Sequence, residues 1–539
     1  MATKEEKNQN KIISIKVTLI LLLIALSAVF TGQKASASII DGETAIGAAS
    51  VQSIENTKKG ILLTWKKKPG ASSYRIFRKS QESGAEWKCV KKSGRNLIAW
   101  QNKSSKLKDG TAYKYVVVAY AKRAGAVSDY AHPERYASKA AKVFRLKPVK
   151  MTSLKANSTV SATAKWKTKK TVSGYEIQFS ADPLFLKKES FVIKSSANAS
   201  TSKTLKAVSK KRYARIRSYK TKDGAAFRSC WSYSPNYKKN PKMTIRYFSK
   251  KGKKLEYRKL AKQKMYGFDV FQGACARGRH SYNFLLNKRK NKAKLIKVDI
   301  ATGKVAQVGK GLVKGHANSF TYNPDKDLMV CANSGSSEKY FTLVNPDTLK
   351  QSKLKKAVIP DEICGIARAR VKKVLKGFTA ISYNPARKKY VARVKKNYNF
   401  VVLSSDFVVE RYVSITKRIK QMKQSMLCTN DMIIDLQSSD GGKFNVLVLY
   451  DWAGNYISTV RLDKKYELED VYEHNGKLYG LAYRSYTKTV VKKVKTKKKK
   501  YKKVKRRTFM RDNYMFSAEK KKKKTGLLFC RNGYNRWVE

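Results

Sequence analysis

From about residue 242 to its end, the chain repeats a pattern of strand, polar turn and strand. The copies begin at Tyr247, Val298, Val344, Leu403 and Leu449. Their starts lie 46 to 59 residues apart, and an apolar strand pair stands between successive copies. Examples of these intervening pairs are 316–324 with 328–330 and 378–385 with 390–392. Each period therefore holds four strands, and one such unit cannot bury its two faces alone.

A four-stranded period of roughly 40 to 50 residues predicts a β-propeller, whose blades bury their faces by closing into a ring. We expect five or six blades over 241–539. The hairpin near Tyr247 has no strand pair before it, so it should complete the last blade with C-terminal strands such as 527–530. Neither a Trp-Asp nor a kelch signature accompanies the period, so no function follows from it.

Two copies of a different module precede the propeller. In the first copy Trp65 is followed nine positions later by Tyr74, and in the second Trp166 is followed nine positions later by Tyr175. A core Trp, a facing strand of alternating aromatic and aliphatic residues, and a Tyr that enters a later strand, such as Tyr113, suit a two-sheet sandwich. The fold class predicted for the mature chain is therefore all-β, with two sandwiches followed by the propeller.

These residues resemble the fibronectin type III family over both modules. The second copy departs from the family by having Lys210-Lys211-Arg212-Tyr213 where the first has Gly110-Thr111-Ala112-Tyr113. Modules of this kind beside a propeller are similar to those of secreted surface proteins of Gram-positive gut bacteria. The resemblance implies spacers that hold the propeller away from a surface, or units that dock carbohydrate or protein, and we expect spacers.

The first 37 residues have the layout of a secretory signal. Basic residues from Lys4 to Lys16 precede an apolar run from Val17 to Phe30, and small residues follow at Ala35 and Ala37. The run is shorter than the roughly 20 residues that span a bilayer, which favours cleavage after Ala37 over an uncleaved anchor.

The predicted domain layout follows from the signal and the two kinds of repeat. It comprises a signal peptide at 1–37, a linker at 38–46, sandwiches at 47–148 and 149–240, and the propeller at 241–539, with Lys-rich hairpins at 488–524.

The charge restricts the partners of an exported chain. Lysine and arginine outnumber aspartate and glutamate by 119 to 37, which gives a net charge of +82. Outside the cell this favours anionic cell-wall polymers or glycans, and surface proteins, while export disfavours nucleic acid. Seven cysteines and four histidines show no paired spacing, so neither a metal site nor a cofactor is expected.

The densest basic segment is predicted to bind polyanions. Its candidate residues are Lys497, Lys498, Lys499, Lys500, Arg506 and Arg507. An alternative is that these residues are only the solvated tips of hairpins, where lysine discourages edge-to-edge pairing of strands.

A second candidate site lies in the propeller channel, because the first strand of each blade lines it. The polar residues predicted there are Gln272, His316, Asn318, Gln424 and Glu469, with Thr379, Ser425 and Asp470 beside them. Amides and carboxyls of this kind suit a polyhydroxylated ligand, but they also serve as ordinary hydrogen-bonded channel groups.

The leading hypothesis is a secreted or cell-wall-associated binding protein, held on anionic polymers or glycans, with the propeller as its ligand-binding or partner-binding platform. The alternative is an extracellular lyase or glycosidase that uses Gln272, His316, Gln424 and Glu469 around the channel mouth. No catalytic residue is assigned, because the sequence has no nucleophile elbow and no metal cluster.

Overall fold

The computed structural model describes residues 42–122, 133–206, 213–239, 241–247, 268, 270–332, 340–419, 422–464, 466–495, 501–519 and 528–533. Nearly all regular structure in these residues is β-strand, and the helices are short turns such as α3 (Val371–Val374). The all-β prediction is confirmed. The predicted signal peptide lies outside the described residues.

The first sandwich packs two antiparallel sheets around Trp65. One sheet orders β2 (Val51–Thr57), β3 (Gly60–Trp65) and β6 (Ala99–Asn102). The other orders β1 (Glu43–Ala48), β7 (Ala112–Lys122), β4 (Ser73–Ser80) and β5 (Lys88–Gly94), with β8 (Ala141–Phe144) also on β7. Trp65 is fully buried, and its ring meets Tyr74 edge-on with 5.7 Å between centroids. The Tyr113 hydroxyl accepts the Lys108 N–H at 3.0 Å and fixes the expected corner.

The predicted linker at 38–46 is wrong in its second half. Strand β1 begins at Glu43 and pairs with β7, Glu43 lying opposite Lys122. Backbone hydrogen bonds therefore draw this segment into the first sandwich.

The second sandwich repeats the arrangement. One sheet orders β13 (Ser200–Thr204), β10 (Ser161–Trp166) and β9 (Met151–Ala156). The other orders β12 (Glu189–Ile193), β11 (Gly174–Ser180), β14 (Tyr213–Lys222) and β15 (Ala225–Arg228), with β16 (Ser232–Tyr233) on β14. Trp166 packs on Tyr175 with 5.3 Å between ring centroids. The divergent turn at Lys210–Arg212 lies outside the described residues.

Beyond the sandwiches, the described residues form five successive antiparallel sheets, three with four strands and two with five. One of them consists of β23 (Ser319–Asn323), β24 (Leu328–Ala332), β25 (Tyr340–Val344) and β26 (Gln351–Lys356). The next consists of β27 (Phe378–Asn384), β28 (Lys389–Val394), β29 (Phe400–Leu403) and β30 (Val409–Val413). A third consists of β31 (Lys423–Cys428), β32 (Ile433–Ser438), β33 (Asn445–Tyr450) and β34 (Tyr456–Arg461). Before them come β18 (Val270–Arg277), β19 (His280–Asn287), β20 (Lys292–Asp299) and β21 (Val305–Val308), with β22 (Val313–Lys314) on β20. After them comes the sheet of β35 (Glu467–His474), β36 (Lys477–Lys495), β37 (Tyr501–Glu519) and β17 (Thr244–Tyr247).

The first strands of these sheets form a closed series. Strand β18 contacts β23, which contacts β27, and the series continues through β31 and β35 back to β18. An apolar cluster fills the space between each pair of neighbouring sheets. Phe284 against Phe320, with centroids 4.7 Å apart, is one such contact. Burial of both faces of every sheet thus requires the ring.

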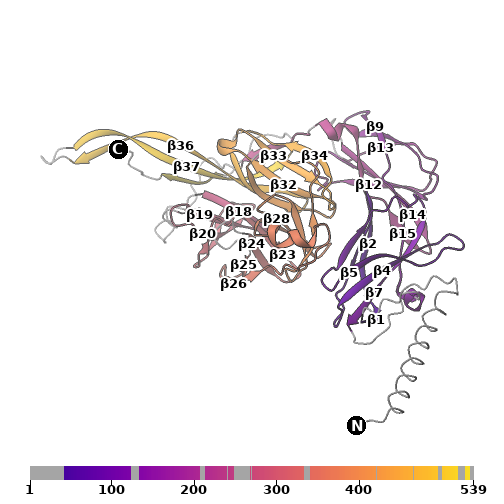
Figure 1. Cartoon of the computed structure of the whole chain (residues 1–539). Coiled ribbons are helices and arrows are strands. Elements are labelled where there is room, and N and C mark those ends of the chain that lie inside the picture. The colour runs from indigo at the N-terminus through magenta and orange to yellow at the C-terminus, as the bar shows by residue number, and fades with distance from the viewer. Residues whose placement is uncertain are drawn as a thin grey trace, which may run out of the picture.

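Strands from both ends of the propeller region meet on β37, as predicted. Strand β17 pairs with the inner part of β37, Tyr247 lying opposite Phe516. Strand β38 (Leu528–Gly533) pairs farther out, Asn532 lying opposite Arg511. The remainder of β36 and β37 forms one long hairpin that projects beyond the sheet (Figure 1). We call residues 477–511 the basic hairpin. Strands β36 and β37 cover 488–495 and 501–519 of the predicted Lys-rich segment 488–524 and form a single hairpin there, where several hairpins were predicted.

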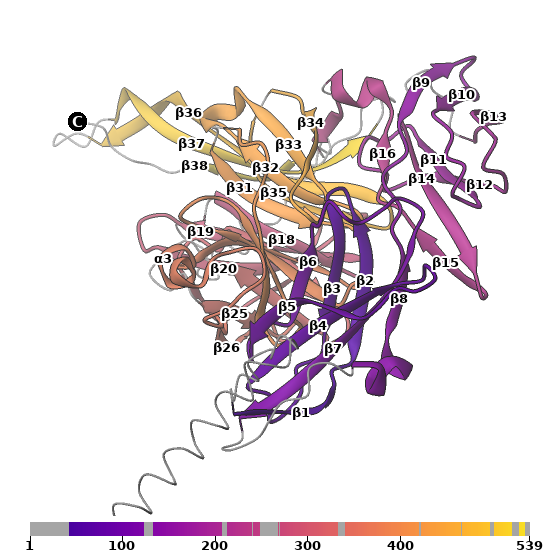
Figure 2. The same cartoon turned by 45° about the vertical axis from the view of Figure 1, so that its right-hand side comes forward.

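Both sandwiches pack against the propeller (Figures 1 and 2). The Gly94 N–H of the first sandwich donates to Glu362 at 2.7 Å, and the Ser458 hydroxyl of the propeller donates to the Tyr237 carbonyl oxygen, which follows the second sandwich. The sandwiches also meet each other, since the Asn56 amide donates to the Arg228 carbonyl oxygen at 3.0 Å. Modules folded onto the propeller cannot act as the spacers that we expected.

Candidate functional site: the channel mouth and the basic hairpin

The predicted channel residues stand at irregularities in the first strands. The pairing register shifts across Gln272 in β18, Thr379 in β27, Gln424 in β31 and Glu469 in β35. A β-bulge inserts an extra residue and re-aims the side chains around it, and bulges concentrate next to functional sites. The sequence therefore places its polar residues where the strands bend. We call the region around Gln272, Thr379, Gln424 and Glu469 the channel mouth.

Glycine makes one of these bulges possible. A Cβ on Gly273 would lie 2.6 Å from the Ala317 carbonyl oxygen, so β18 can approach the segment before β23 this closely only without a side chain. The Gly273 N–H donates to the same oxygen at 2.8 Å.

Three of the five predicted ligand-binding residues are buried at the channel mouth. Gln272, Gln424 and Glu469 are each less than a tenth exposed. The Gln272 amide donates to the Phe271 carbonyl oxygen at 2.8 Å, and it also lies near enough to Glu469 to act on the pKa of that carboxyl group. The Gln424 amide instead donates to Glu467 at 3.0 Å.

Glu467 is a member of the cluster that sequence reasoning missed. Burial raises the pKa of Glu467. Burial, followed by the neighbouring charge of Glu467, raises the pKa of Glu469 well above its ordinary value. The signal that could have identified Glu467 is the Glu-Leu-Glu-Asp run at the start of the strand. A carboxyl group such as Glu469, when protonated, can both donate to and accept from a ligand hydroxyl.

His316 and Asn318 lie before β23 and not within it, and both are half-buried. Burial, and then the charge of Lys288, lowers the pKa of His316, so the imidazole is neutral at pH 7. The charged group that acts on His316 is Lys288 and not Glu469. This geometry does not support the acid–base pair that the enzyme hypothesis requires.

Asp470 is a structural tie between the first strands. Its carboxyl group accepts the N–H groups of Ala274, Phe320 and Val471. These donors belong to β18, β23 and β35, while the Ser425 hydroxyl of β31 donates to Ser319 at 3.0 Å. Asp470 is fully buried, and burial raises its pKa well above the usual range. Its partners are all within the protein, as expected of a satisfied buried group.

Thr379 is likewise engaged. Its hydroxyl accepts Arg393 Nε at 3.0 Å, and the same guanidinium forms a buried ion pair with Asp435 at 2.6 Å. Arg393 also donates to the backbone oxygens of Gln424 and Ser425. Thr379, Arg393, Asp435 and Asp470 are therefore parts of a hydrogen-bonded polar core among the first strands. We call the neighbouring group of Gln272, Gln424, Glu467 and Glu469 the outer polar cluster.

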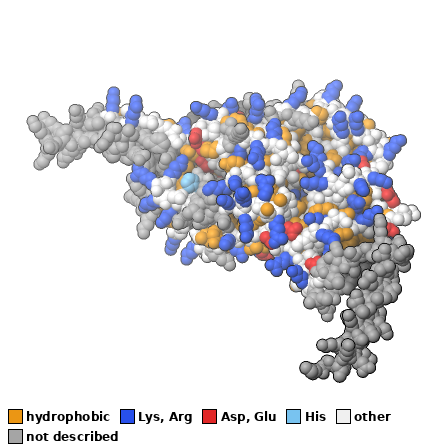
Figure 3. All heavy atoms as spheres, in the orientation of Figure 1, with side chains coloured by type: hydrophobic (Ala, Val, Ile, Leu, Met, Phe, Trp, Pro, Cys, Tyr) orange, Lys and Arg blue, Asp and Glu red, His pale blue; other side chains and the backbone are white. Residues whose placement is uncertain are grey.

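The basic hairpin carries the polyanion candidates. Lys497–Lys500 lie outside the described residues, and the side chain of Arg506 is not described. Lys488, Lys505 and Arg507 are exposed, and the register sets Lys505 opposite Val491. Between 477 and 511 the chain has 16 lysines and arginines and no acidic residue. Basic side chains are spread over the visible face of the described residues, with fewer acidic side chains among them (Figure 3).

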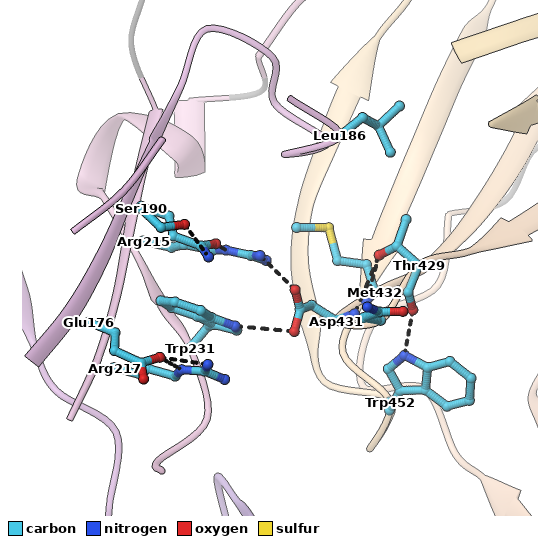
Figure 4. A network of polar contacts seen from close by, with 12 residues as sticks. Glu176, Leu186, Ser190, Arg215, Arg217, Trp231, Thr429, Asp431, Met432 and Trp452 are labelled. Atoms are coloured by element: carbon cyan, nitrogen blue, oxygen red, sulfur yellow. Dashed lines mark hydrogen bonds and ion pairs between the residues drawn. The ribbon is translucent and has the colours of Figure 1, made fainter. Parts of the chain in front are cut away.

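A charged contact between the second sandwich and the propeller was not foreseen. Arg215 donates to Asp431 at 2.6 Å, and Trp231 Nε1 donates to the other carboxylate oxygen at 3.2 Å (Figure 4). Burial alone would raise the pKa of Asp431, but the charge and hydrogen bond of Arg215 hold it below its ordinary value. Arg387 of the propeller pairs with Glu55 of the first sandwich at 3.1 Å.

Comparison with known proteins finds no matching family model and no matching curated protein. Among solved structures, a two-domain fibronectin type III segment of chicken tenascin is 14% identical, with a TM-score of 0.18 over 35% of this chain and 97% of the other. The β-propeller domain of Swd1 from Myceliophteria thermophila is 10% identical, with a TM-score of 0.24 over 46% of this chain and 85% of that domain.

Hydrazine synthase of Kuenenia stuttgartiensis is 14% identical with a TM-score of 0.26, over 45% of this chain. This chain spans only 62% of that enzyme chain. Similarities at these TM-scores carry no argument about function, so the proposals below rest on the structure itself.

Among the residues that the structure describes, no group of three or more His, Cys, Asp or Glu side chains is arranged to hold a metal ion. No helix in the same part of the chain has the length and apolar character needed to cross a membrane.

Proposed function

We propose that this protein is a secreted or cell-wall-associated binding protein held on anionic envelope polymers or glycans by its basic surface. The observation that carries the proposal is the basic hairpin, with 16 basic and no acidic residues over 477–511. Such a segment attracts polyanions over a distance set by the Debye length, about 8 Å at physiological ionic strength. The proposed export rests on the signal-like segment at 1–37.

In this proposal the body of the protein is a five-bladed propeller. The closed series of first strands and the five apolar clusters between sheets support that number. The sandwiches form one platform with the propeller, supported by the Arg215–Asp431 and Arg387–Glu55 pairs. In this proposal the buried outer polar cluster at the channel mouth is a second candidate site for a ligand.

The test is attachment to purified Gram-positive cell walls across a salt series. We expect the full chain to bind at low salt and to elute as salt rises, because screening weakens exposed charge pairs. The variant Lys488→Gln/Lys505→Gln/Arg507→Gln should elute at lower salt. The matched control is Lys155→Gln/Lys165→Gln/Lys167→Gln, which removes three exposed charges from the second sandwich. Binding that is indifferent to salt, or an equal loss in both variants, would refute the role of the hairpin.

A second candidate function is a lyase or glycosidase acting on polysaccharide. One observation favours it, since Glu467 and Glu469 interact and burial raises the pKa of Glu469 well above its ordinary value, as it does for the general acid of a glycosidase. Product analysis on cell-wall and plant polysaccharides, repeated with Glu467→Gln and Glu469→Gln, tests it. Turnover that is unchanged in both variants excludes this pair as the catalytic acids.

A further inference from the structure

A cavity of about 920 Å³ lies where the two sandwiches and the propeller meet. The first sandwich contributes the end of β2, the second contributes β15 and the segment after it, and the propeller contributes the turns around Asp431 and Trp452. Sites for small ligands have volumes of roughly 300 to 1,000 Å³ and often lie at domain interfaces. We call this cavity the interdomain cleft. It is separate from both the channel mouth and the basic hairpin.

The walls of the interdomain cleft are held in place before any ligand arrives. Arg215, itself 1% exposed, ties the second sandwich to the propeller through Asp431. Arg387 ties the propeller to Glu55 of the first sandwich. The contact between Asn56 and the Arg228 carbonyl oxygen joins the sandwiches on the third side. A preformed cavity spares a ligand the cost of ordering its walls.

Aromatic rings line the interdomain cleft from two of its three sides. They are Phe227, Trp231, Tyr233 and Tyr237 from the second sandwich and the segment after it, and Trp452 and Tyr456 from the propeller. Two of the rings already have cations over them: the Arg217 and Arg215 guanidiniums lie 4.3 and 4.5 Å from the Trp231 centroid, and that of Arg387 lies 4.6 Å from Trp452. The aromatic side chains therefore offer apolar contact beside positive charge, as required by a ligand that has both apolar and acidic groups.

The acidic groups that line the interdomain cleft are already engaged. Glu55 pairs with Arg387, and Asp431 pairs with Arg215. Asp451 accepts the N–H groups of Ala453 and Asn455 in its own turn, and burial raises its pKa. Lys58, Lys142 and Lys150 also line the cavity, and all three are exposed. The field inside the cleft is therefore positive.

We propose that the interdomain cleft binds a short anionic oligosaccharide whose acidic groups meet the lysines and whose sugar faces pack on the aromatic rings. The ligand class rests on the proposed function, because the polymer that holds the protein would supply such a chain. An isolated inorganic anion would leave the aromatic lining unused. The acidic groups could be carboxylates, as in uronic acids, or phosphates, as in wall polymers, and the experiment separates these two sources.

The test is calorimetric titration of the full chain with three probes, a short oligogalacturonate, a short glycerol-phosphate oligomer and a neutral malto-oligosaccharide. We expect one of the anionic probes to bind and the neutral one not to bind. The variant Lys58→Gln/Lys150→Gln should weaken binding about tenfold, since two charge-assisted contacts are lost. Ala226 is exposed and lines the cleft, so Ala226→Trp should block it sterically.

The matched control is Lys165→Gln/Lys167→Gln, an equal charge change on exposed residues that do not line the cavity. Retained affinity in both Ala226→Trp and Lys58→Gln/Lys150→Gln overturns the proposal, and so does preference for a tetraglutamate peptide over both oligosaccharides. The hairpin variant distinguishes this site from wall attachment, because it should lose salt-sensitive attachment to walls and keep the titrated affinity. Failure of the wall experiment alone would leave the cleft result standing.

Discussion

Arg215 of β14 and Asp431 of the turn between β31 and β32 form an ion pair at 2.6 Å although they are 216 residues apart in the chain. The guanidinium is held further by Gln178 at 2.7 Å and lies over the rings of Phe185 and Trp231. Every face of this cation is thus occupied by groups from either the second sandwich or the propeller. The contact fixes the second sandwich to the propeller.

The first prediction concerns this pair. Asp431→Asn should destabilise the protein by about 2 to 3 kcal/mol, because it leaves the nearly fully buried Arg215 charge without its counterion. Urea unfolding followed by tryptophan fluorescence measures the loss. The control is Asp347→Asn, whose side chain is 64% exposed in its pair with Arg277 and should cost less than about 1 kcal/mol. Equal losses in the two variants would contradict the structural role of Arg215–Asp431.

The second prediction concerns the tie at the centre of the ring. Asp470→Ala should destabilise the propeller by about 3 to 5 kcal/mol, because it leaves the buried N–H groups of Ala274 and Phe320 without their acceptor. Thermal unfolding of the variant provides the measurement. Ser158→Ala, which removes an exposed hydroxyl on the second sandwich, is a control for loss of surface hydrogen bonds. A midpoint unchanged by Asp470→Ala would show that Asp470 does not tie the strands.

Features that depend on neighbours in the chain were predictable. The spacing of Trp65 and Tyr74 identified a sandwich core, because both residues belong to strands that face each other within one module. The hairpin period identified the repeated sheets because four of the five described sheets consist of strands that follow one another in the chain.

Features that depend on distant pairing were not predictable. No local pattern links Arg215 with Asp431, or Arg387 with Glu55, since both contacts arise only when separate modules pack together. The residues that line the interdomain cleft come from three modules for the same reason. At the channel mouth, the polar residue types were visible in the sequence. The bulges at these residues were visible only in the three-dimensional arrangement. The same holds for the different roles of the neighbours Glu469, which lies in the outer polar cluster, and Asp470, which ties the first strands together.

The third prediction is an acid-dependent loss at the turn after β20. The Thr302 N–H, and further on Arg279, lower the pKa of Asp299 to about 2. Because the folded pKa lies below the unfolded value of about 3.9, the stabilisation is complete above that value and is lost as the pH falls through about 2. Asp299→Asn should remove this dependence. The unfolding free energies of the native protein and of Asp299→Asn are measured between pH 5 and pH 2, at about every half pH unit. The two curves should converge at the acid end. Parallel curves would contradict the lowered pKa.

The fourth prediction has the opposite sign and concerns Glu469. Burial, and then the charge of Glu467, raises its pKa well above the ordinary value, so the folded protein holds a proton that the unfolded chain releases. Stability is therefore greatest below the unfolded pKa of about 4.3 and falls as the pH rises from there through the folded pKa.

Glutamine resembles the protonated carboxyl and cannot ionise, so Glu469→Gln should remove this loss. We expect the stability of the variant, measured relative to the native protein, to be greater at about pH 8 than at about pH 4. The first pH lies above the unfolded pKa of about 4.3 and the second lies below it. Urea unfolding at the two pH values measures the difference. Glu473→Gln, which changes a residue on the exposed end of the same strand, is the control and should show no such change. A Glu469→Gln variant that loses stability equally at both pH values would show that the carboxyl group is ionised in the folded protein, and the outer polar cluster would then carry a charge suited to a cation and not to a neutral hydroxyl group.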